Sequence, residues 1–251
     1  MIHETAQIHP SVSISDDVEI GAYAVINKNV TIDSGCIVKN HAIVGENTSL
    51  GKNNTIFQFA TVGEEPQDLK FSGETTRCTI GDNNIFREYC SIHRGTKAGI
   101  SDTIIGNDNL FMAYTHVAHD CVINDNCVLS NAASLAGHVY LESNVSLGGF
   151  TLVHQFCNVG KFAFSGLGSV ISQDVTPYTL VAGNHAKAYK INSEGLRRNK
   201  FSNETIKNIE KTFKIFLKSS STLEEKKESF KKLNISDDEA KYFINFIENS
   251  E

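Results

Sequence analysis

The 251-residue chain contains no long hydrophobic run. None of its segments approaches the ~18 consecutive apolar residues that a membrane-spanning helix requires. Its first residues, Met1–Ala6, show no basic region followed by an apolar stretch, so we expect no secretory signal and a cytoplasmic protein. The six cysteines include no CxxC pair, which argues against a cysteine-ligated metal. Hydrophobic residues make up 40% of the chain, enough to bury one continuous core.

A period of six residues dominates what is present. A branched or long aliphatic residue recurs at every sixth position, ten times without a miss, from Ile8 to Val62. The position four further on is small or β-branched in eight of nine repeats, and Asn54 is the exception. Six residues make one short strand and a turn, so three hexapeptides can close a triangular coil that stacks on the next coil. The chain is therefore predicted to form a parallel β-helix.

The repeat is interrupted twice and ends near Pro177. The interruptions, at about 63–79 and 97–104, are polar, contain glycine and are too long for coil corners. We predict that both are loops directed outward from the prism, a location that often carries function. The expected organisation is a β-helical domain over 1–182 and a second domain over 183–251.

All six cysteines fall in the small inward position of the repeat or its equivalent. A buried free cysteine behaves as a small hydrophobic residue. We therefore predict core cysteines and a reducing compartment, not disulfides or zinc ligands.

The C-terminal segment differs in charge and periodicity. From Lys187 to Lys232 there are thirteen Lys and Arg against six Asp and Glu, a local charge of +7. Apolar residues follow helical spacing after Ser202, and Thr222 with Glu225 and Ser236 with Glu239 resemble capping boxes. Two or three amphipathic helices are expected. Their lysines form either a solvated face or a docking surface for an acidic or phosphate-bearing partner.

Histidines are the best candidates for chemistry. Counted in coils of eighteen residues, four of them fall near one edge of the prism: His116, His119, His138 and His154. Three interpretations stay open on the residues alone: surface histidines, a zinc site like that of the β-helical carbonic anhydrases, or general acid–base catalysis. Asp120 follows His119 directly, and adjacent strand residues point to opposite faces, so a bond between them requires a bend or a neighbouring subunit.

Five motifs, together with the repeat, resemble one family closely: Ile92–Thr96, His116–Cys121, Asn131–Val139, Val153–Phe156 and Gly183–Ala186. The family is that of the UDP-N-acetylglucosamine O-acyltransferases of lipid A biosynthesis. The resemblance covers essentially the whole chain. It implies a left-handed parallel β-helix, a helical C-terminal domain and a homotrimer with active sites between subunits. It also implies acyl carrier protein and UDP-N-acetylglucosamine as partners, without nucleic acid, membrane insertion, cofactor or metal.

The resemblance implies transfer of a 3-hydroxyacyl group from acyl carrier protein to the sugar 3-hydroxyl. In that reaction His119 would be the general base, oriented by Asp120, and the backbone N–H of Gly137 would stabilise the oxyanion. The implied substrate-binding residues are Gln67, Asp68, Lys70, His116, His138, His154, Gln155, Asn192, Glu194 and Arg198. The alternative acceptor, a 3-amino analogue of the sugar, stays open.

The chain departs from the family's pattern at two places. After Arg198, where a second arginine is common, it has Asn199 and Lys200, which suggests a weaker or shifted phosphate contact. Leu167 occupies the position of the family's hydrocarbon ruler, a glycine in members that use long chains. Because extra methylenes against a packed side chain cost about 1–3 kcal/mol, we predict an acyl chain of about ten to twelve carbons.

The basic C-terminal segment suits an acidic acyl carrier protein, with candidate contacts at Lys200, Lys207, Lys211, Lys214 and Lys218. Three other functions can be compared with this one. The related N-acyltransferase carries an additional N-terminal uridine-binding domain, whereas here the repeats begin at Ile8. A γ-type carbonic anhydrase has no need of this helical segment, and a purely structural solenoid has no need of the histidines.

Overall fold

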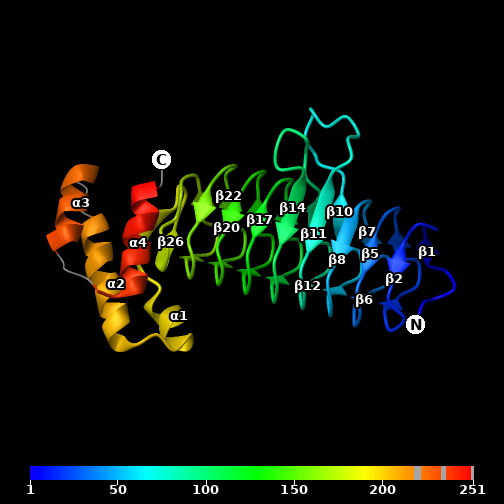
Figure 1. Cartoon of the computed structure of the whole chain (residues 1–251), viewed down its shortest axis with the longest axis horizontal. Coiled ribbons are helices and arrows are strands. Elements are labelled where there is room, and N and C mark those ends of the chain that lie inside the picture. The colour runs from blue at the N-terminus through cyan, green and yellow to red at the C-terminus, as the bar shows by residue number, and fades with distance from the viewer. Residues whose placement is uncertain (218–221, 233–235, 250–251) are drawn as a thin grey trace.

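The computed structural model describes residues 1–217, 222–232 and 236–249. A long three-sided β-helix is followed by a group of helices at its C-terminal end (Figure 1). Each side of the prism is one sheet, and the chain visits the three sheets in turn. The first sheet contains β1 (Gln7–Ile8), β4 (Val25–Ile26), β7 (Ile43–Val44), β10 (Thr61–Glu64), β13 (Ser91–His93), β16 (His116–Val117), β19 (Ser134–Leu135), β22 (Leu152–Val153) and β25 (Val170–Ile171).

The other two sheets complete each coil. The second sheet contains β2 (Ser13–Ile14), β5 (Thr31–Ile32), β8 (Thr48–Leu50), β11 (Arg77–Ile80), β14 (Asp102–Ile105), β17 (Val122–Ile123), β20 (Tyr140–Leu141) and β23 (Asn158–Val159). The third contains β3 (Glu19–Ile20), β6 (Ile37–Val38), β9 (Thr55–Ile56), β12 (Ile85–Phe86), β15 (Leu110–Phe111), β18 (Val128–Leu129), β21 (Ser146–Leu147), β24 (Phe164–Ser165), β26 (Thr179–Ala182) and β27 (Lys187–Ile191).

The register of these sheets is the register of the sequence repeat. Ile8 pairs with Ile26 and Ile26 with Val44, one coil apart each time. The pairing continues across both interruptions, from Val62 to Ile92 and from Ile92 to Val117. The two loops therefore leave and rejoin the prism without breaking its stack of coils, with one local register shift between Val62 and Glu64.

The core is made of the aliphatic anchors and the small residues between them, as the repeat predicts. All six cysteines are buried and free, so the prediction of core cysteines is confirmed. Asn54, the exception in the small position, is satisfied inside the prism: its amide donates to the carbonyls of Gly51 and Gly81, both at 2.8 Å. Its side-chain oxygen accepts from the backbone N–H of Asn84, which occupies the same place in the next coil. Buried amides are tolerated here because backbone groups satisfy them.

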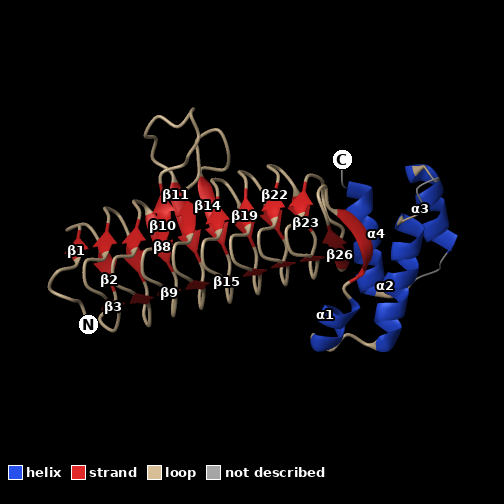
Figure 2. Ribbon diagram, turned by 180° about the vertical axis from the view of Figure 1, so that it is seen from behind, coloured by secondary structure: helices blue, strands red, loops and turns tan. Residues whose placement is uncertain are grey.

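Both outward loops leave the prism between the first and second sheets (Figure 2). The first runs over 65–76 between β10 and β11, and the second over 94–101 between β13 and β14. The first loop is shorter than expected, because β10 extends to Glu64 and β11 begins at Arg77. The second lies about three residues earlier than expected, between the end of β13 and the start of β14. We call this corner of the prism, where the chain turns from the first sheet to the second, the histidine edge.

A second corner, where the chain turns from the third sheet to the first, carries a row of stacked rings and is called the aromatic edge. It is defined by Tyr23, His41, Phe59, Tyr89 and Tyr114, with centroids 5.0–5.3 Å apart between neighbours. The spacing follows from the strand spacing, since each coil contributes one ring at the same corner. The histidine and aromatic edges lie on either side of the first sheet.

Four helices follow the β-helix: α1 (Ser193–Arg198), α2 (Asn203–Phe216), α3 (Leu223–Lys232) and α4 (Asp238–Asn249). The segment expected to be wholly helical begins with a strand, β27, which pairs antiparallel with β26 and closes the last coil. Ser202 caps α2 through the N–H of Thr205, and the predicted capping box of Thr222 and Glu225 is formed in both directions. None of the helices within the described ranges is long and apolar enough to cross a bilayer.

A polar network fastens α4 to the β-helix. The hydroxyls of Tyr178 and Tyr242 donate to Glu239 and Glu142, respectively, and Lys161 lies 2.6 Å from Glu239. The predicted capping box of Ser236 and Glu239 is wrong, because the Glu239 carboxylate is engaged in this network. Asp237 caps α4 instead, and its carboxylate accepts from the N–H groups of Glu239 and Ala240 at 3.1 Å.

Candidate active site

Four consecutive coils contribute to a cluster of imidazoles on the histidine edge. Ser91 of β13 pairs with His116 of β16, which pairs with Ser134 of β19, so the side chains at this corner stack from coil to coil. The rings of His93 and His116 meet edge to face at 4.9 Å, and those of His119 and His138 do so at 5.1 Å. His154 lies at the same corner of the following coil and is exposed.

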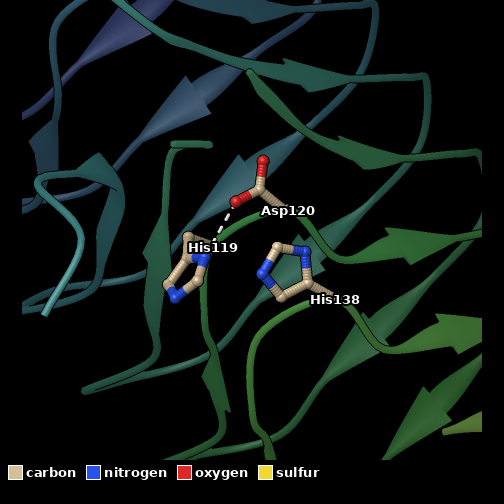
Figure 3. Close-up of side chains that lie close together, drawn as sticks. All are labelled: His119, Asp120 and His138. Carbon is tan, nitrogen blue, oxygen red and sulfur yellow. Dashed lines mark hydrogen bonds and ion pairs between the residues drawn. The ribbon is translucent and has the colours of Figure 1, made fainter. Parts of the chain in front are cut away.

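His119 and Asp120 are joined directly. Nδ1 of His119 lies 2.8 Å from Oδ2 of Asp120 (Figure 3). The bond is possible within one chain because Asp120 occupies the corner itself, with φ 59°, and its side chain turns back towards its neighbour. The bend that the sequence analysis required is thus the ordinary left-handed corner residue of a coil, a conformation that aspartate adopts more readily than most residues.

The Asp120 carboxylate is buried, at 4% exposure, and is satisfied by the second outward loop. The hydroxyl of Thr96 donates to Oδ2 at 2.6 Å, and the Thr96 N–H lies 3.1 Å from both oxygens. A carboxylate only accepts hydrogen bonds when ionised, so the His119 nitrogen that faces it carries the proton. The tautomer of His119 is therefore fixed, and its Nε2 is left as a proton acceptor.

Gly137 lies against the His119 ring. A Cβ at this position would come within 2.7 Å of Cε1 and 2.9 Å of Nε2, so only glycine permits this approach. The Gly137 N–H makes no hydrogen bond with the part of the chain that the structure describes. A free backbone donor beside the acceptor nitrogen is the arrangement expected of an oxyanion site.

One ring and one hydroxyl hold the imidazoles of the cluster in place. The Phe156 ring stacks on His138 at 4.6 Å, and the Nδ1 of His116 lies 2.8 Å from the Ser91 hydroxyl. Burial lowers the pKa of His93 to about 4, with a further contribution from the neighbouring imidazoles. Burial also lowers the pKa of His116, and this effect outweighs a hydrogen bond with Ser91 that raises it. Both rings are therefore neutral at neutral pH and add no positive charge to the cluster.

One group within the described residues has the composition of a metal site. The ligand atoms of His119, Asp120 and His138 all lie within 4.8 Å of one another. Imidazole and carboxylate would suit zinc. However, the Asp120 oxygens already accept hydrogen bonds from Thr96 and His119, so the carboxylate would have to leave the Thr96 loop to ligate an ion.

The three loop residues expected to contact substrate lie on the first outward loop. Gln67 and Lys70 are exposed, and Asp68 is half-buried and accepts from the Lys70 N–H at 2.9 Å in a local turn. The loop is tied to the cluster at its base, where buried Arg94 lies 3.2 Å from Glu65 and follows His93 in the chain. The loop therefore rises beside the histidine cluster.

Three further predicted residues lie at the other end of the molecule. Asn192 caps α1 by accepting from the Gly195 N–H at 3.1 Å, and Glu194 pairs with Arg198 at 3.4 Å. Helix α1 lies on the side of the prism away from the outward loops (Figure 1). Within one chain these residues do not join the histidine cluster.

Leu167 also lies apart from the histidines. It projects from the aromatic edge, where the chain turns from β24 to β25, and is 78% exposed. One of its methyl groups lies over Gly149 of the preceding coil, so a Cβ there would stand 3.1 Å from it. Gln155, next to His154, is exposed at the histidine edge. The predicted site residues thus occupy two edges and one end of the prism.

Sequence reasoning left out two residues of the cluster. Counting coils does not place His93, because the second interruption obscures how its coil aligns, yet β13 pairs in register with β16 and brings the rings of His93 and His116 together. Thr96 was noted only as part of a motif. Its position at the end of Ile92–Thr96, directly before a loop, was the available signal.

Two family models match the chain. The model described as UDP-N-acetylglucosamine O-acyltransferase, domain 2, matches residues 174–251. A bacterial transferase hexapeptide model of six repeats matches residues 102–137. The first covers the helical segment together with the last coil of the β-helix, and the second covers the coils that hold His116 and His119.

The chain matches curated relatives over most of their length, and two of these relatives share one name. The chain is 52% identical to the acyl-(acyl-carrier-protein)–UDP-N-acetylglucosamine O-acyltransferase of Herminiimonas arsenicoxydans over 227 residues, which cover 90% of this chain and 87% of that protein. It is 50% identical to the enzyme of that name from Pseudomonas aeruginosa over 225 residues, with the same coverage.

Solved structures agree in fold. The structure of the acyltransferase from Acinetobacter baumannii superposes with a TM-score of 0.96 at 43% identity and covers 100% of this chain and 97% of that one. The enzyme from Arabidopsis superposes with a TM-score of 0.84 at 35% identity, covering 98% and 95%. The predicted left-handed parallel β-helix with a helical C-terminal segment is confirmed.

Proposed function

Because the chain belongs to the family of acyl-(acyl-carrier-protein)–UDP-N-acetylglucosamine O-acyltransferases, we propose that it transfers a 3-hydroxyacyl group to the sugar 3-hydroxyl with His119 as general base. The chain is an acyltransferase that moves an acyl group from acyl carrier protein to UDP-N-acetylglucosamine in lipid A biosynthesis. The observation that carries the finer proposal is the bond of His119 to a buried, fully satisfied Asp120.

The geometry supplies each group that the reaction needs. Nε2 of His119 accepts the proton of the 3-hydroxyl as its oxygen attacks the thioester carbonyl, and Asp120 stabilises the imidazolium that forms. The Gly137 N–H donates to the oxygen of the tetrahedral intermediate. Collapse breaks the carbon–sulfur bond, and the imidazolium returns the proton to the leaving thiolate. Acyl transfer is direct in this scheme and routes no step through a metal or cofactor.

We assign the remaining polar groups of the histidine edge to substrate binding. His116, His138, His154 and Gln155 present polar atoms along successive coils beside His119. The neutral state of His116 leaves it able both to donate and to accept hydrogen bonds with sugar hydroxyls.

We assign the sugar nucleotide to residues that come from different places in the fold. Gln67, Asp68 and Lys70 rise beside the cluster, whereas Asn192, Glu194 and Arg198 lie at the far end of the prism. Arg198 suits a phosphate because its guanidinium offers several donors in a fixed plane. A second copy of the chain could complete the site by bringing its α1 end and its aromatic edge to the histidine edge of the first copy. Repeating this contact around a three-fold axis would give a trimer with three equivalent sites.

The trimer is tested by the mass of the protein in solution. We expect light scattering after size exclusion to give three times the 27.6 kDa of one chain at assay concentration. We expect assembly because a lone chain leaves the apolar side chains of the aromatic edge and Leu167 exposed to water. A monomeric mass in a sample that retains full activity would contradict the shared site.

The acyl carrier protein is expected to approach through the basic segment. Lys200, Lys207, Lys211 and Lys214 are exposed, and Lys214 also pairs with Glu210 at 2.9 Å. Lys218 lies outside the described residues. The six buried thiols fit a reducing compartment such as the cytoplasm, where acyl carrier protein would be met.

Salt is expected to slow the reaction with the carrier protein. Complementary charge mainly raises the encounter rate, so kcat/KM for the acyl carrier protein should fall by roughly tenfold from low to high salt. The control is the same acyl group on free pantetheine, for which kcat/KM should stay nearly constant. Equal salt dependence for both donors would argue against electrostatic docking.

The proposal is tested against the carbonic anhydrase alternative in one experiment. Purified protein, treated with a zinc chelator, is incubated with UDP-N-acetylglucosamine and a 3-hydroxyacyl carrier protein, and the sugar nucleotide is analysed by mass spectrometry. We expect O-acylated product at an undiminished rate. Absence of transfer together with chelator-sensitive hydration of carbon dioxide would overturn the proposal, and acylation of a 3-amino sugar only would correct the acceptor.

A further inference from the structure

The second outward loop encloses the carboxylate that orients His119. A carboxylate at 4% exposure is costly unless its oxygens are satisfied. Apart from His119, the hydrogen-bond donors to the Asp120 carboxylate among the described residues come from one residue of this loop, Thr96, which is itself 2% exposed. The loop therefore does more than connect β13 to β14.

Thr96 holds the carboxylate at two points. Its hydroxyl donates to Oδ2 at 2.6 Å and its N–H points between both oxygens at 3.1 Å. Oδ2 is also the atom that faces Nδ1 of His119. A change in the Thr96 hydroxyl is therefore transmitted through one oxygen atom to the imidazole.

Gly99 packs directly against the Asp120 carboxylate. A Cβ on Gly99 would lie 2.3 Å from the carboxyl carbon of Asp120 and 2.4 and 2.5 Å from its two oxygens. The backbone of the loop thus lies flat against the carboxylate, and no side chain fits between them. This packing is independent of the hydrogen bonds that Thr96 makes.

Hydrogen bonds and close packing fix the second outward loop, so it can hold the Asp120 carboxylate in one position. The N–H groups of Gly99 and Ser101 both donate to the Thr96 carbonyl at 3.1 Å, which folds 96–101 into a tight turn. The Gly95 N–H donates to the carbonyl of Arg77 at 2.9 Å, and a Cβ on Gly95 would meet the Asp102 nitrogen at 2.1 Å. From the Asp120 side, its N–H donates to the buried Thr103 hydroxyl at 2.9 Å.

We propose that Thr96 and Gly99 are positioning residues for catalysis, which hold the Asp120 carboxylate in the one orientation that fixes the proton on Nδ1 of His119. The inference rests on the proposed function of His119 and Asp120. Neither Thr96 nor Gly99 touches substrate in this proposal. Both act through the angle and hydrogen bonding of a single carboxylate.

Thr96→Val tests this most sharply because it keeps the shape and removes the donor. We expect kcat to fall by roughly 10- to 100-fold with KM for both substrates unchanged, since a misplacement of about 1 Å can cost on the order of 100-fold. The pH at half-maximal kcat/KM should rise, because a carboxylate with fewer donors attracts the imidazolium more strongly. Thr96→Ser should restore both, and Gly99→Ala should lower kcat in the same way.

Thr212→Val is the matched control. Thr212 is buried in α2 and its hydroxyl donates to the Asn208 carbonyl at 3.0 Å, far from the histidine edge in the chain's C-terminal helices. We expect a lower melting temperature with kcat and pH profile unchanged. The inference is overturned if Thr96→Val and Gly99→Ala keep wild-type kcat, or if Thr96→Val loses activity with an unmoved pH profile. If wild-type protein transfers no acyl group, the proposed function itself fails and this inference with it.

Discussion

Replacing His119 with alanine is expected to lower kcat for acyl transfer by about 10³-fold. General base catalysis typically contributes 10²- to 10⁴-fold, and no other imidazole of the cluster has a buried carboxylate on its Nδ1 within the described structure. Asp120→Asn should cause a loss of similar order, because an amide in place of the carboxylate would favour the wrong tautomer of His119. Transfer that remains would come from the Gly137 donor and from bound, oriented substrates.

The measurement is steady-state transfer with each purified variant, beside His9→Ala as a matched control. His9 is exposed at the same edge of the first coil, and among the described residues its imidazole bonds only to Ser11, so its loss should leave kcat unchanged. Circular dichroism and oligomeric mass establish that each variant folds. If both His119→Ala and Asp120→Asn kept the wild-type kcat, His119 would not be the general base.

Replacing Leu167 with glycine is expected to shift the preferred donor to a longer acyl chain. Leu167 is 78% exposed on the single chain and stands at the aromatic edge, which in the proposed trimer would face a neighbour's histidine edge. Its side chain would then block the end of the acyl groove. Each additional buried methylene is worth ~0.8 kcal/mol, or about fourfold, so two more carbons should gain roughly 15-fold in relative kcat/KM.

Competition among donors measures this shift directly. Wild type should favour about ten to twelve carbons, and Leu167→Gly should favour a donor longer by at least one methylene pair. Leu217→Gly is the control, since this exposed leucine ends α2 and lies outside the proposed groove. An unchanged preference in Leu167→Gly would show that another residue sets the chain length.

The fold could be predicted because one physical constraint repeats in every coil. A six-residue period determines which side chains face inward, so the anchors, the cysteines and the in-register pairing followed from counting. The interruptions were harder to delimit, because β11 and β14 extend beyond the hexapeptide pattern. The strand β27 was missed because it closes the last coil by antiparallel pairing, which no repeat encodes.

The site was predictable only in part. Coil counting placed the histidines at one edge, but the bond between His119 and Asp120 depends on a left-handed corner residue that alternation on a strand cannot show. The role of Thr96 depends on how a non-repeating loop folds back over Asp120, and its local sequence does not specify that contact. Asn192 and Leu167 lie apart from the histidines within one chain, and the proposed site between subunits would bring these residues together.

The central claim is that the protein transfers one 3-hydroxyacyl group of limited length to UDP-N-acetylglucosamine, with His119 as the general base. The most direct measurement is mass spectrometry of the sugar nucleotide after incubation with an equimolar mixture of 3-hydroxyacyl carrier proteins of increasing chain length, for wild type and His119→Ala. The account predicts a single O-acylated product, dominated by a donor of about ten to twelve carbons, which is lost in the variant. Equal products from wild type and His119→Ala would contradict it, as would a mixture without preference among the donors.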